Sequence, residues 1–215
     1  MDSTGAANLA LGRVGVGQAI AALTDNTVTA KTCNRFFEQC RQEVLRAHPW
    51  GFALRAQPLA QVSAQTFPGW GYVYQYPDDC LTVRAIADSA GMRVIRDAFL
   101  SGDVARDQIV QSIKVPFQLA LKDDGASQVV LTDLADAWAF FTVDVDNTGV
   151  WPADFGSVFA WRLAMEIGGP LQAKADLVAA AKNEYLWWLS HATAASMNEQ
   201  RDDTPAESPS ITCRY

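Results

Sequence analysis

Three pairs of acidic residues have the types and the spacing that could perform chemistry: Asp78 with Asp79, Asp123 with Asp124, and Asp144 with Asp146. Two opposed carboxylates can act as acid and base on a glycosidic bond, or hold a divalent cation through their oxygens. Asp123 and Asp124 stand in a turn pattern, where aspartates accept hydrogen bonds from the backbone. Asp144 and Asp146 alternate at the end of a strand pattern and precede a loop. We therefore expect all three pairs to be ordinary surface charges.

The other side chains that carry chemistry are the cysteines and histidines: Cys33, Cys40, Cys80, Cys213, His48 and His191. Cys33 and Cys40 would lie two turns apart on one helix, roughly 10 Å along its axis, too far for a disulfide. No C-x-x-C pair occurs, so we expect no zinc site, and reduced, mostly buried thiols as in a cytosolic protein. His48 has no obvious serine or cysteine partner, and we interpret it as a helix-end histidine that interacts with terminal carbonyl groups.

Signature motifs of enzymes are missing from the sequence, which has no G-x-S-x-G, no H-E-x-x-H and no P-loop. The segment "GRVGVG" at 12–17 is rich in glycine, but no strand pattern precedes it and no phosphate-binding lysine follows it. The sequence therefore predicts no catalytic residue, no cofactor and no metal, in a protein that is not an enzyme.

The composition describes a chain that can bury a sizeable core. It has 215 residues, 49% of them hydrophobic and 19% charged, which suits one globular unit or one unit with an inserted lobe. The formal net charge of -7 argues against a nucleic-acid-binding protein, because such binding needs clustered lysine and arginine. No apolar run approaches a membrane span, and no signal peptide is expected, so we predict synthesis in a cytoplasm.

Residues 3–50 have a helical pattern. A first short helix, capped by Ser3 or Thr4, precedes an amphipathic helix. The apolar residues of this second helix recur at intervals of three and four: Cys33, Phe36, Phe37, Cys40, Val44 and Leu45. Pro49 ends the helix, because the residue before a proline is pushed out of the α region. Trp50 is interpreted as a wedge packed at the helix end rather than as a ligand platform.

Residues 52–151 are predicted to form a mainly antiparallel β lobe. Strand patterns occupy residues 52–62, 69–77, 78–88, 115–121, 128–134 and 137–147. The strands at 115–121 and 128–134 are expected to form a hairpin through the Asp-Gly step between them. The segment "MRVIRDAFLSG" at 92–102 is expected to add a strand, and residues 103–113 a short helix.

Residues 152–198 return to a helical pattern. Pro152 suits a first turn, and the apolar stripe that follows ends at Gly168: Phe155, Val158, Phe159, Leu163 and Ile167. Pro170 is predicted to start the final helix. Trp187 lies beside the apolar face of that helix, and two interpretations stay open for it: contact with a neighbouring subunit, or packing in the core.

The last segment, residues 199–215, contains two prolines and four acids and too few apolar residues to form a core. Ile211, Arg214 and Tyr215 are side chains of the kind that anchor a segment on a partner. A docking tail that a partner orders and a terminus without a partner are equal alternatives on composition.

These patterns predict an α+β fold. The helical body is a discontinuous bundle of residues 1–51 and 152–198, the inserted β lobe is 52–151, and a flexible, extended docking tail is 199–215. The helices from the two ends of the chain are expected to pack together.

Three stretches of the sequence resemble one protein family: "ALGRVG" at 10–15, "TAKTCNRFFEQCRQEVLRAHPWGFA" at 29–53 and "YVYQYPDDCLTV" at 72–83. They are similar to the head-to-tail adaptor proteins of short-tailed phages, the tail tubular protein A family. There a long helix ends in His-Pro-Trp-x-Phe-Ala, and a strand with Tyr-x-Tyr-x-x-Pro-x-Asp-Cys-Leu follows. The resemblance covers 10–83, extends to 152–198 by arrangement only, and does not include 90–150.

The resemblance implies a structural virion protein at the head-to-tail junction. Its copies would form a ring of about twelve below the portal protein, continue the DNA channel and carry the tail nozzle protein. Double-stranded DNA would pass through without specific binding, which suits a negative net charge because a lumen that attracted phosphates would hold the duplex back. No membrane is implied, and no catalytic residue is carried over.

Two other functions remain as alternatives. The first is a virion-associated peptidoglycan hydrolase that uses acids such as Glu38 or Glu43, although exposed acids on an amphipathic helix lack the apolar pocket that raises the pKa of a general acid. The second is a single-strand nucleic-acid binder that uses the many aromatic residues, which the acidic charge disfavours.

Overall fold

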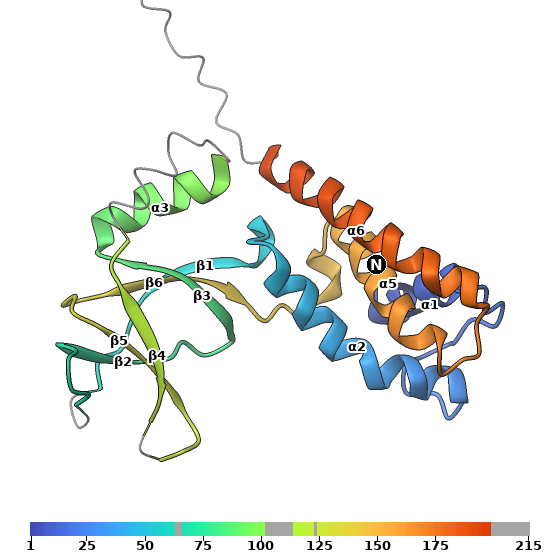
Figure 1. Cartoon of the computed structure of the whole chain (residues 1–215), viewed down its shortest axis with the longest axis horizontal. Helices are drawn as coiled ribbons and strands as arrows, with labels where there is room; N and C mark the ends of the chain where they lie inside the picture. Colours follow the sequence, from blue (N-terminus) through green and yellow to red (C-terminus); the bar gives the residue numbers. More distant parts are fainter. Residues whose placement is uncertain (63–65, 102–113, 123, 199–215) are drawn as a thin grey trace, which may run out of the picture.

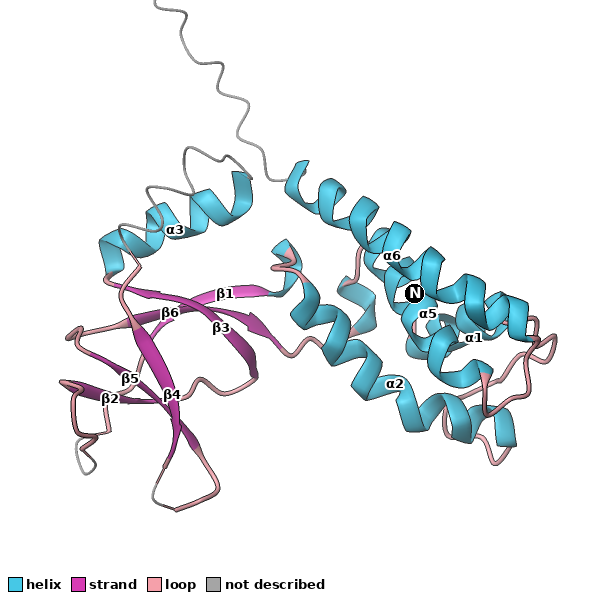
Figure 2. Ribbon diagram, viewed as in Figure 1, coloured by secondary structure: helices cyan, strands magenta, loops and turns pink. Residues whose placement is uncertain are grey.

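The computed structural model describes residues 1–62, 66–101, 114–122 and 124–198. Over these residues the fold is mixed α/β, with five α-helices and two small antiparallel sheets (Figures 1 and 2). The α-helices are α1 (Ser3–Arg13), α2 (Val28–Ala47), α3 (Ser89–Ser101), α5 (Ala153–Gly168) and α6 (Ala175–Asn198), and η1 (Gly51–Ala53) and η2 (Thr148–Val150) are short 3-10 helices. The strands are β1 (Leu54–Pro58), β2 (Tyr72–Gln75), β3 (Cys80–Ala87), β4 (Phe117–Leu121), β5 (Gln128–Thr132) and β6 (Trp138–Val143).

The strands form two sheets of three, in the orders β1-β6-β3 and β2-β5-β4, and all neighbours are antiparallel. Phe141 and Val83 of the first sheet share a hydrophobic cluster with Tyr74 and Val130 of the second. The predicted β4–β5 hairpin is confirmed, and Gly125 has a φ of 68° in its turn, a conformation that glycine adopts at little cost.

Residues 92–101 of the segment expected as a strand at 92–102 belong instead to helix α3, so that prediction was wrong, and residue 102 lies outside the described residues. Asp88 accepts a hydrogen bond from the Gly91 amide at 2.6 Å, as an N-cap does. Met92 and Ile95, three residues apart, are buried on the sheet against Phe140. Figure 2 shows α3 lying over the strands. The helix expected at 103–113 lies outside the described residues.

Helix α1 is capped by Asp2, whose carboxylate accepts from the Gly5 amide at 2.7 Å, and not by Ser3 or Thr4. Helix α2 follows the predicted pattern. Thr27 caps its first turn, and the predicted apolar residues are buried except for the half-buried Phe36.

The predicted stop at Pro49 is confirmed. His48 already has extended backbone angles, and the Trp50 ring folds back so that its Nε1 donates to the Val44 carbonyl oxygen at 2.8 Å. Trp50 is 2% exposed, so it is the predicted wedge at the end of α2.

Helix α5 buries all five residues of its predicted apolar stripe and ends at Gly168, as expected. Pro170 does not start the last helix, which begins at Ala175. The amides of Leu171 and Ala173 bond back to carbonyls at the end of α5, and Gln172 has a φ of 55°. These bonds close the end of α5 with a turn, and α6 can start only after that turn.

Helix α5 packs against α1, α2 and α6, and side chains of all four helices belong to one hydrophobic cluster. Segments from both ends of the chain therefore meet. Figure 1 shows these helices at one end of the molecule and the strands at the other. None of the described helices is long and apolar enough to cross a bilayer.

Polar contacts join the helices to the strands. The Asp144 carboxylate, just after β6, accepts from Arg41 and from Gln42 of α2. Arg84 of β3 donates to the Arg46 carbonyl oxygen at 2.9 Å, in the last turn of α2.

Candidate functional site

Of the acidic residues that could have carried chemistry, Asp124 accepts hydrogen bonds from the backbone and Asp144 binds an arginine. Asp124 accepts from the amides of Ala126 and Ser127 in the hairpin turn, and these bonds hold its pKa below the ordinary value. Asp123 lies outside the described residues. Asp144 differs from the prediction, because it is not an ordinary surface charge but the acceptor for the 3% exposed Arg41.

The remaining pair, Asp78 and Asp79, precedes β3, and Asp79 has a φ of 56° in the turn that leads into it. Over the described ranges, no group of three or more potential ligand side chains has the geometry of a metal site. Asp78 and Asp79 are both exposed, as expected for surface charges.

The thiols lie where their reactivity is low. Burial raises the pKa of Cys33 to about 11 and that of Cys40 to about 12. Cys80 is half-buried, and burial raises its pKa as well. Because the thiolate is the reactive form, these three cysteines are packing residues at neutral pH. Cys213 lies outside the described residues.

His48 was expected to interact with terminal carbonyls of α2, and that interpretation was wrong. Burial, with the charge of Arg84 beside it, lowers the pKa of His48 to about 4. Its ring packs edge-on against Trp50 with centroids 4.9 Å apart. The cation at the helix end is Arg84, which comes from β3.

Two acids were named for the hydrolase alternative, Glu38 and Glu43, and both are in ion pairs. Glu38 binds Arg41 at 2.5 Å, and Glu43 binds Arg162 of α5 at 2.6 Å. The side chains of Glu38 and Glu43 are 65% and 39% exposed, so neither carboxylate lies in the apolar pocket of a general acid.

Of the four residues predicted to bind a partner, the structure describes only Trp187. Trp187 is 52% exposed on α6, so the interpretation that it packs in the core was wrong. Its ring contacts those of Trp188 and His191. Ile211, Arg214 and Tyr215 lie outside the described residues.

Trp187 is one of three large apolar side chains that α6 exposes. Leu186 is 55% exposed and Met197 is 37% exposed, while Ala181 and Ala192 on the opposite side are buried against the other helices. A helix with one apolar face in the core and large apolar side chains on the other has a surface suited to a partner. We call Leu186, Trp187 and Met197 the outer α6 surface.

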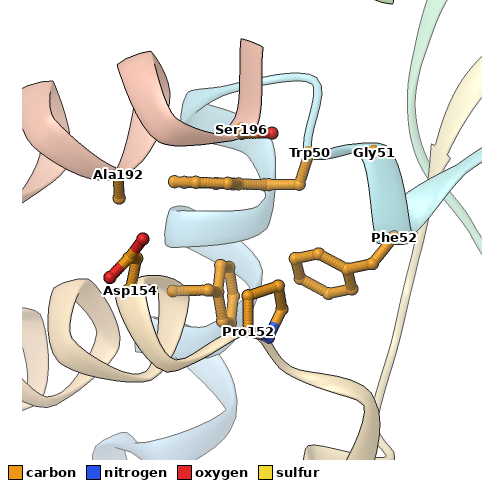
Figure 3. A pocket seen from close by; sticks show the side chains of 8 residues that line it. Trp50, Gly51, Phe52, Pro152, Asp154, Ala192 and Ser196 are labelled. Carbon is orange, nitrogen blue, oxygen red and sulfur yellow. The ribbon is translucent and has the colours of Figure 1, made fainter. Parts of the chain in front are cut away.

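The structure also contains a cavity that the sequence did not predict, because Trp50 was interpreted only as a packing residue. A cavity of about 50 Å³ lies beside Trp50, between η1, the first turn of α5 and the last two turns of α6 (Figure 3). Phe52 and Phe155 line it, and the Phe155 ring stands edge-on to both Trp50 and Phe52, with centroids 5.2 and 4.9 Å apart. The closely spaced aromatic residues of "HPWGF" were the only hint of this cavity in the sequence. The residues of α5 and α6 that form its other walls lie about 100 residues or more further along the chain.

One acid reaches this cavity. Asp154, in the first turn of α5, contributes a half-buried carboxylate, and Ser196 of α6 adds a hydroxyl. Figure 3 shows Ser196 and Asp154 on opposite sides of the Trp50 ring.

No protein-family model matches this chain, and the comparison with curated proteins finds no match.

Proposed function

We propose that this chain is a structural virion protein, a head-to-tail adaptor of a short-tailed phage. About twelve copies form a ring between the portal protein and the tail nozzle protein, and the ring continues the DNA channel. The resemblance of the segments 10–15, 29–53 and 72–83 to that family is the starting point for this proposal.

The proposal includes a domain organisation. Residues 1–51 and 152–198 form one discontinuous helical body, and residues 52–151 are a β lobe inserted into it. Support comes from the shared hydrophobic cluster of α1, α2, α5 and α6. In a ring, such bodies supply lateral contacts, and the lobe and the segment 199–215 reach other partners.

The observation that carries the proposal is the outer α6 surface. Leu186 and Trp187 are each more than half exposed, although tryptophan is one of the costliest side chains to leave in water. Covering them in a subunit contact removes that cost, and tryptophan is enriched at the centres of interfaces. The expected partner there is a neighbouring copy or the portal.

Electron microscopy of the purified chain mixed with the portal of the same phage tests the proposal directly. Rings on the portal's lower face are the expected outcome. A portal that stays bare at micromolar concentrations of this chain contradicts the adaptor function. A zymogram on peptidoglycan tests the enzymatic alternative, for which no feature of the described residues argues.

The segment 199–215 has its own test. Deletion of 201–215 is expected to abolish attachment to the portal and to leave a folded protein with an unchanged circular dichroism spectrum, because these residues are too polar to contribute to the core. Attachment at full strength by the truncated chain would exclude a docking role for the tail.

A further inference from the structure

We propose that the cavity beside Trp50 is a binding site for a cationic side chain, an arginine inserted by a partner protein. This function is separate from the adaptor role and rests on the geometry of the cavity.

The walls of the cavity suit a cation. Trp50, Phe52 and Phe155 line it. The rings of Trp50 and Phe52 are tilted by 39° to each other, and the Phe155 ring stands edge-on to both. Phe52 is partly exposed, whereas Trp50 is 2% and Phe155 0% exposed, so Phe52 supplies most of the aromatic surface that an entering group can reach. The faces of aromatic rings carry negative charge density and attract cations, tryptophan most strongly, and a planar guanidinium can also stack on them. These walls favour arginine over a neutral polar group.

The carboxylate of the cavity has no partner in the described structure. Across residues 1–62, 66–101, 114–122 and 124–198, Asp154 makes neither a hydrogen bond nor an ion pair, whereas Glu38, Glu43 and Asp144 each bind an arginine. Asp154 is also half-buried, so a cation beside it is screened less by water than on an open surface. A charge-assisted hydrogen bond to a guanidinium is the contact that Asp154 lacks.

Helix ends around the cavity add to the negative potential. The C-terminal turn of α6 borders it through Ser196, and Trp50 follows the C-terminus of α2. The C-terminal end of a helix carries about half a negative charge, while the N-terminus of α5, on the other wall, carries about half a positive charge. The full negative charge of the Asp154 carboxylate is larger than the partial positive charge at the N-terminus of α5. His48, which packs on Trp50, is neutral at pH 7 because its pKa is lowered to about 4, so it does not oppose a cation.

The size of the cavity decides between a side chain and a free small molecule. A volume of about 50 Å³ is the room of three to five waters at roughly 10–15 Å³ each. That accommodates the four heavy atoms of a guanidinium, whereas pockets for whole small ligands take about 300–1,000 Å³. The occupant is therefore the end of one side chain, held in place by the rest of a partner. The chain's net charge of -7 also favours a basic partner surface.

The test uses the full chain, labelled with ¹⁵N, and follows the Trp50 indole N–H resonance, identified from the spectrum of Trp50→Phe. The probes are N-acetyl-arginine amide and N-acetyl-citrulline amide, which have nearly the same shape and differ in charge. We expect a saturable shift with the arginine probe at millimolar concentration, and at least about tenfold weaker binding of the citrulline probe.

Two variants and a control separate the site from a surface effect. Asp154→Asn keeps the shape and removes the charge, and Phe52→Leu removes one aromatic wall, so each is expected to weaken the arginine probe about tenfold or more. Asp176→Asn makes the same charge change in the first turn of α6, about 30 Å along that helix from Ser196, and should leave binding unchanged.

The proposal is overturned if the arginine probe gives no saturable shift by about 50 mM, if citrulline binds equally well, or if Asp154→Asn binds as the unchanged chain does. The isolated chain is used throughout, so these outcomes leave the adaptor function untouched. Conversely, portals without rings in the microscopy experiment would contradict the adaptor function but not this binding site.

Discussion

Arg41 is an arginine inside the molecule, and its two carboxylate partners come from different parts of the chain. Glu38 is one helical turn away on α2, whereas Asp144 follows β6, more than 100 residues later. Burying a guanidinium is costly unless its charge is paired, so Asp144 holds the end of β6 against α2. This contact links the helices to the strands.

Replacing Asp144 by Asn is expected to destabilise the protein by about 1–3 kcal/mol, because Arg41 then keeps one charged partner and Asp144 is itself partly exposed. Urea unfolding followed by circular dichroism measures this. Lys122→Ala, which breaks the exposed pair with Asp124, is the control and should cost less than about 0.5 kcal/mol. Equal losses for the two variants would show that the Arg41 pair has no special role.

His48 gives the molecule a pH-dependent stability. Its pKa is lowered from 6.5 in the unfolded chain to about 4 by burial and then by Arg84. The unfolded state therefore takes up a proton first as the pH falls, and stability that is complete above about pH 6.5 is lost progressively down to about pH 4.

His48→Gln should remove this contribution, so that the variant loses about 2 kcal/mol less than the parent between about pH 7 and pH 4.5. Urea midpoints at the two pH values give the comparison. If His48→Gln keeps the parent's pH dependence, the buried neutral histidine is not its source.

At the scale of the element, the end of α2 depends on a proline and on a tryptophan. Pro49 forbids continuation of the helix, and Trp50 satisfies the Val44 carbonyl while it fills the space between α2 and α5. The stop is local in the sequence, but the contact with Phe155 of α5 is not.

Trp50→Phe should cost about 1–2 kcal/mol, because the Val44 carbonyl loses its donor and the smaller ring leaves space. Thermal unfolding would measure it. Trp187→Phe, the same change on the exposed outer surface of α6, is expected to alter stability by less than about 0.5 kcal/mol. A similar cost for both changes would contradict the wedge role of Trp50.

Replacing either of two glycines by alanine should change the stability of the protein in opposite directions. Gly12 lies inside α1 with nothing within 4 Å of an added Cβ, so Gly12→Ala should stabilise by about 0.5–1 kcal/mol. Gly125 has a φ of 68° in the β4–β5 turn, so Gly125→Ala should destabilise by about 1 kcal/mol although the space is open. Urea midpoints that move in the same direction would refute the account of the turn.

At the scale of the whole molecule, the outer α6 surface is one place where the fold leaves large apolar side chains exposed. Replacing Leu186 and Trp187 together by Ser should weaken ring formation on the portal by at least about tenfold, because the apolar area available for burial is lost, and leave the stability of the single chain almost unchanged. Sedimentation with portal measures assembly. Val28→Ser, on α2, changes another exposed apolar residue and should assemble normally.

The sequence by itself determined the elements whose signals are local. The apolar spacing of α2 and α5, the stop at Pro49, the Asp-Gly hairpin and the strand at Trp138–Val143 all follow from neighbours within a few residues. Helix α3 was missed because a short apolar run fits either a strand or a helix, and its burial against the sheet selects the helix.

Only the tertiary structure decided which faces are covered and which distant residues meet. Trp187 is exposed because the opposite side of α6 faces α5, and Asp144 binds an arginine because β6 ends beside α2. The cavity exists because the ends of three helices meet, and it joins Trp50 to Asp154. Such pairings depend on the path of the whole chain, which local periodicity does not encode.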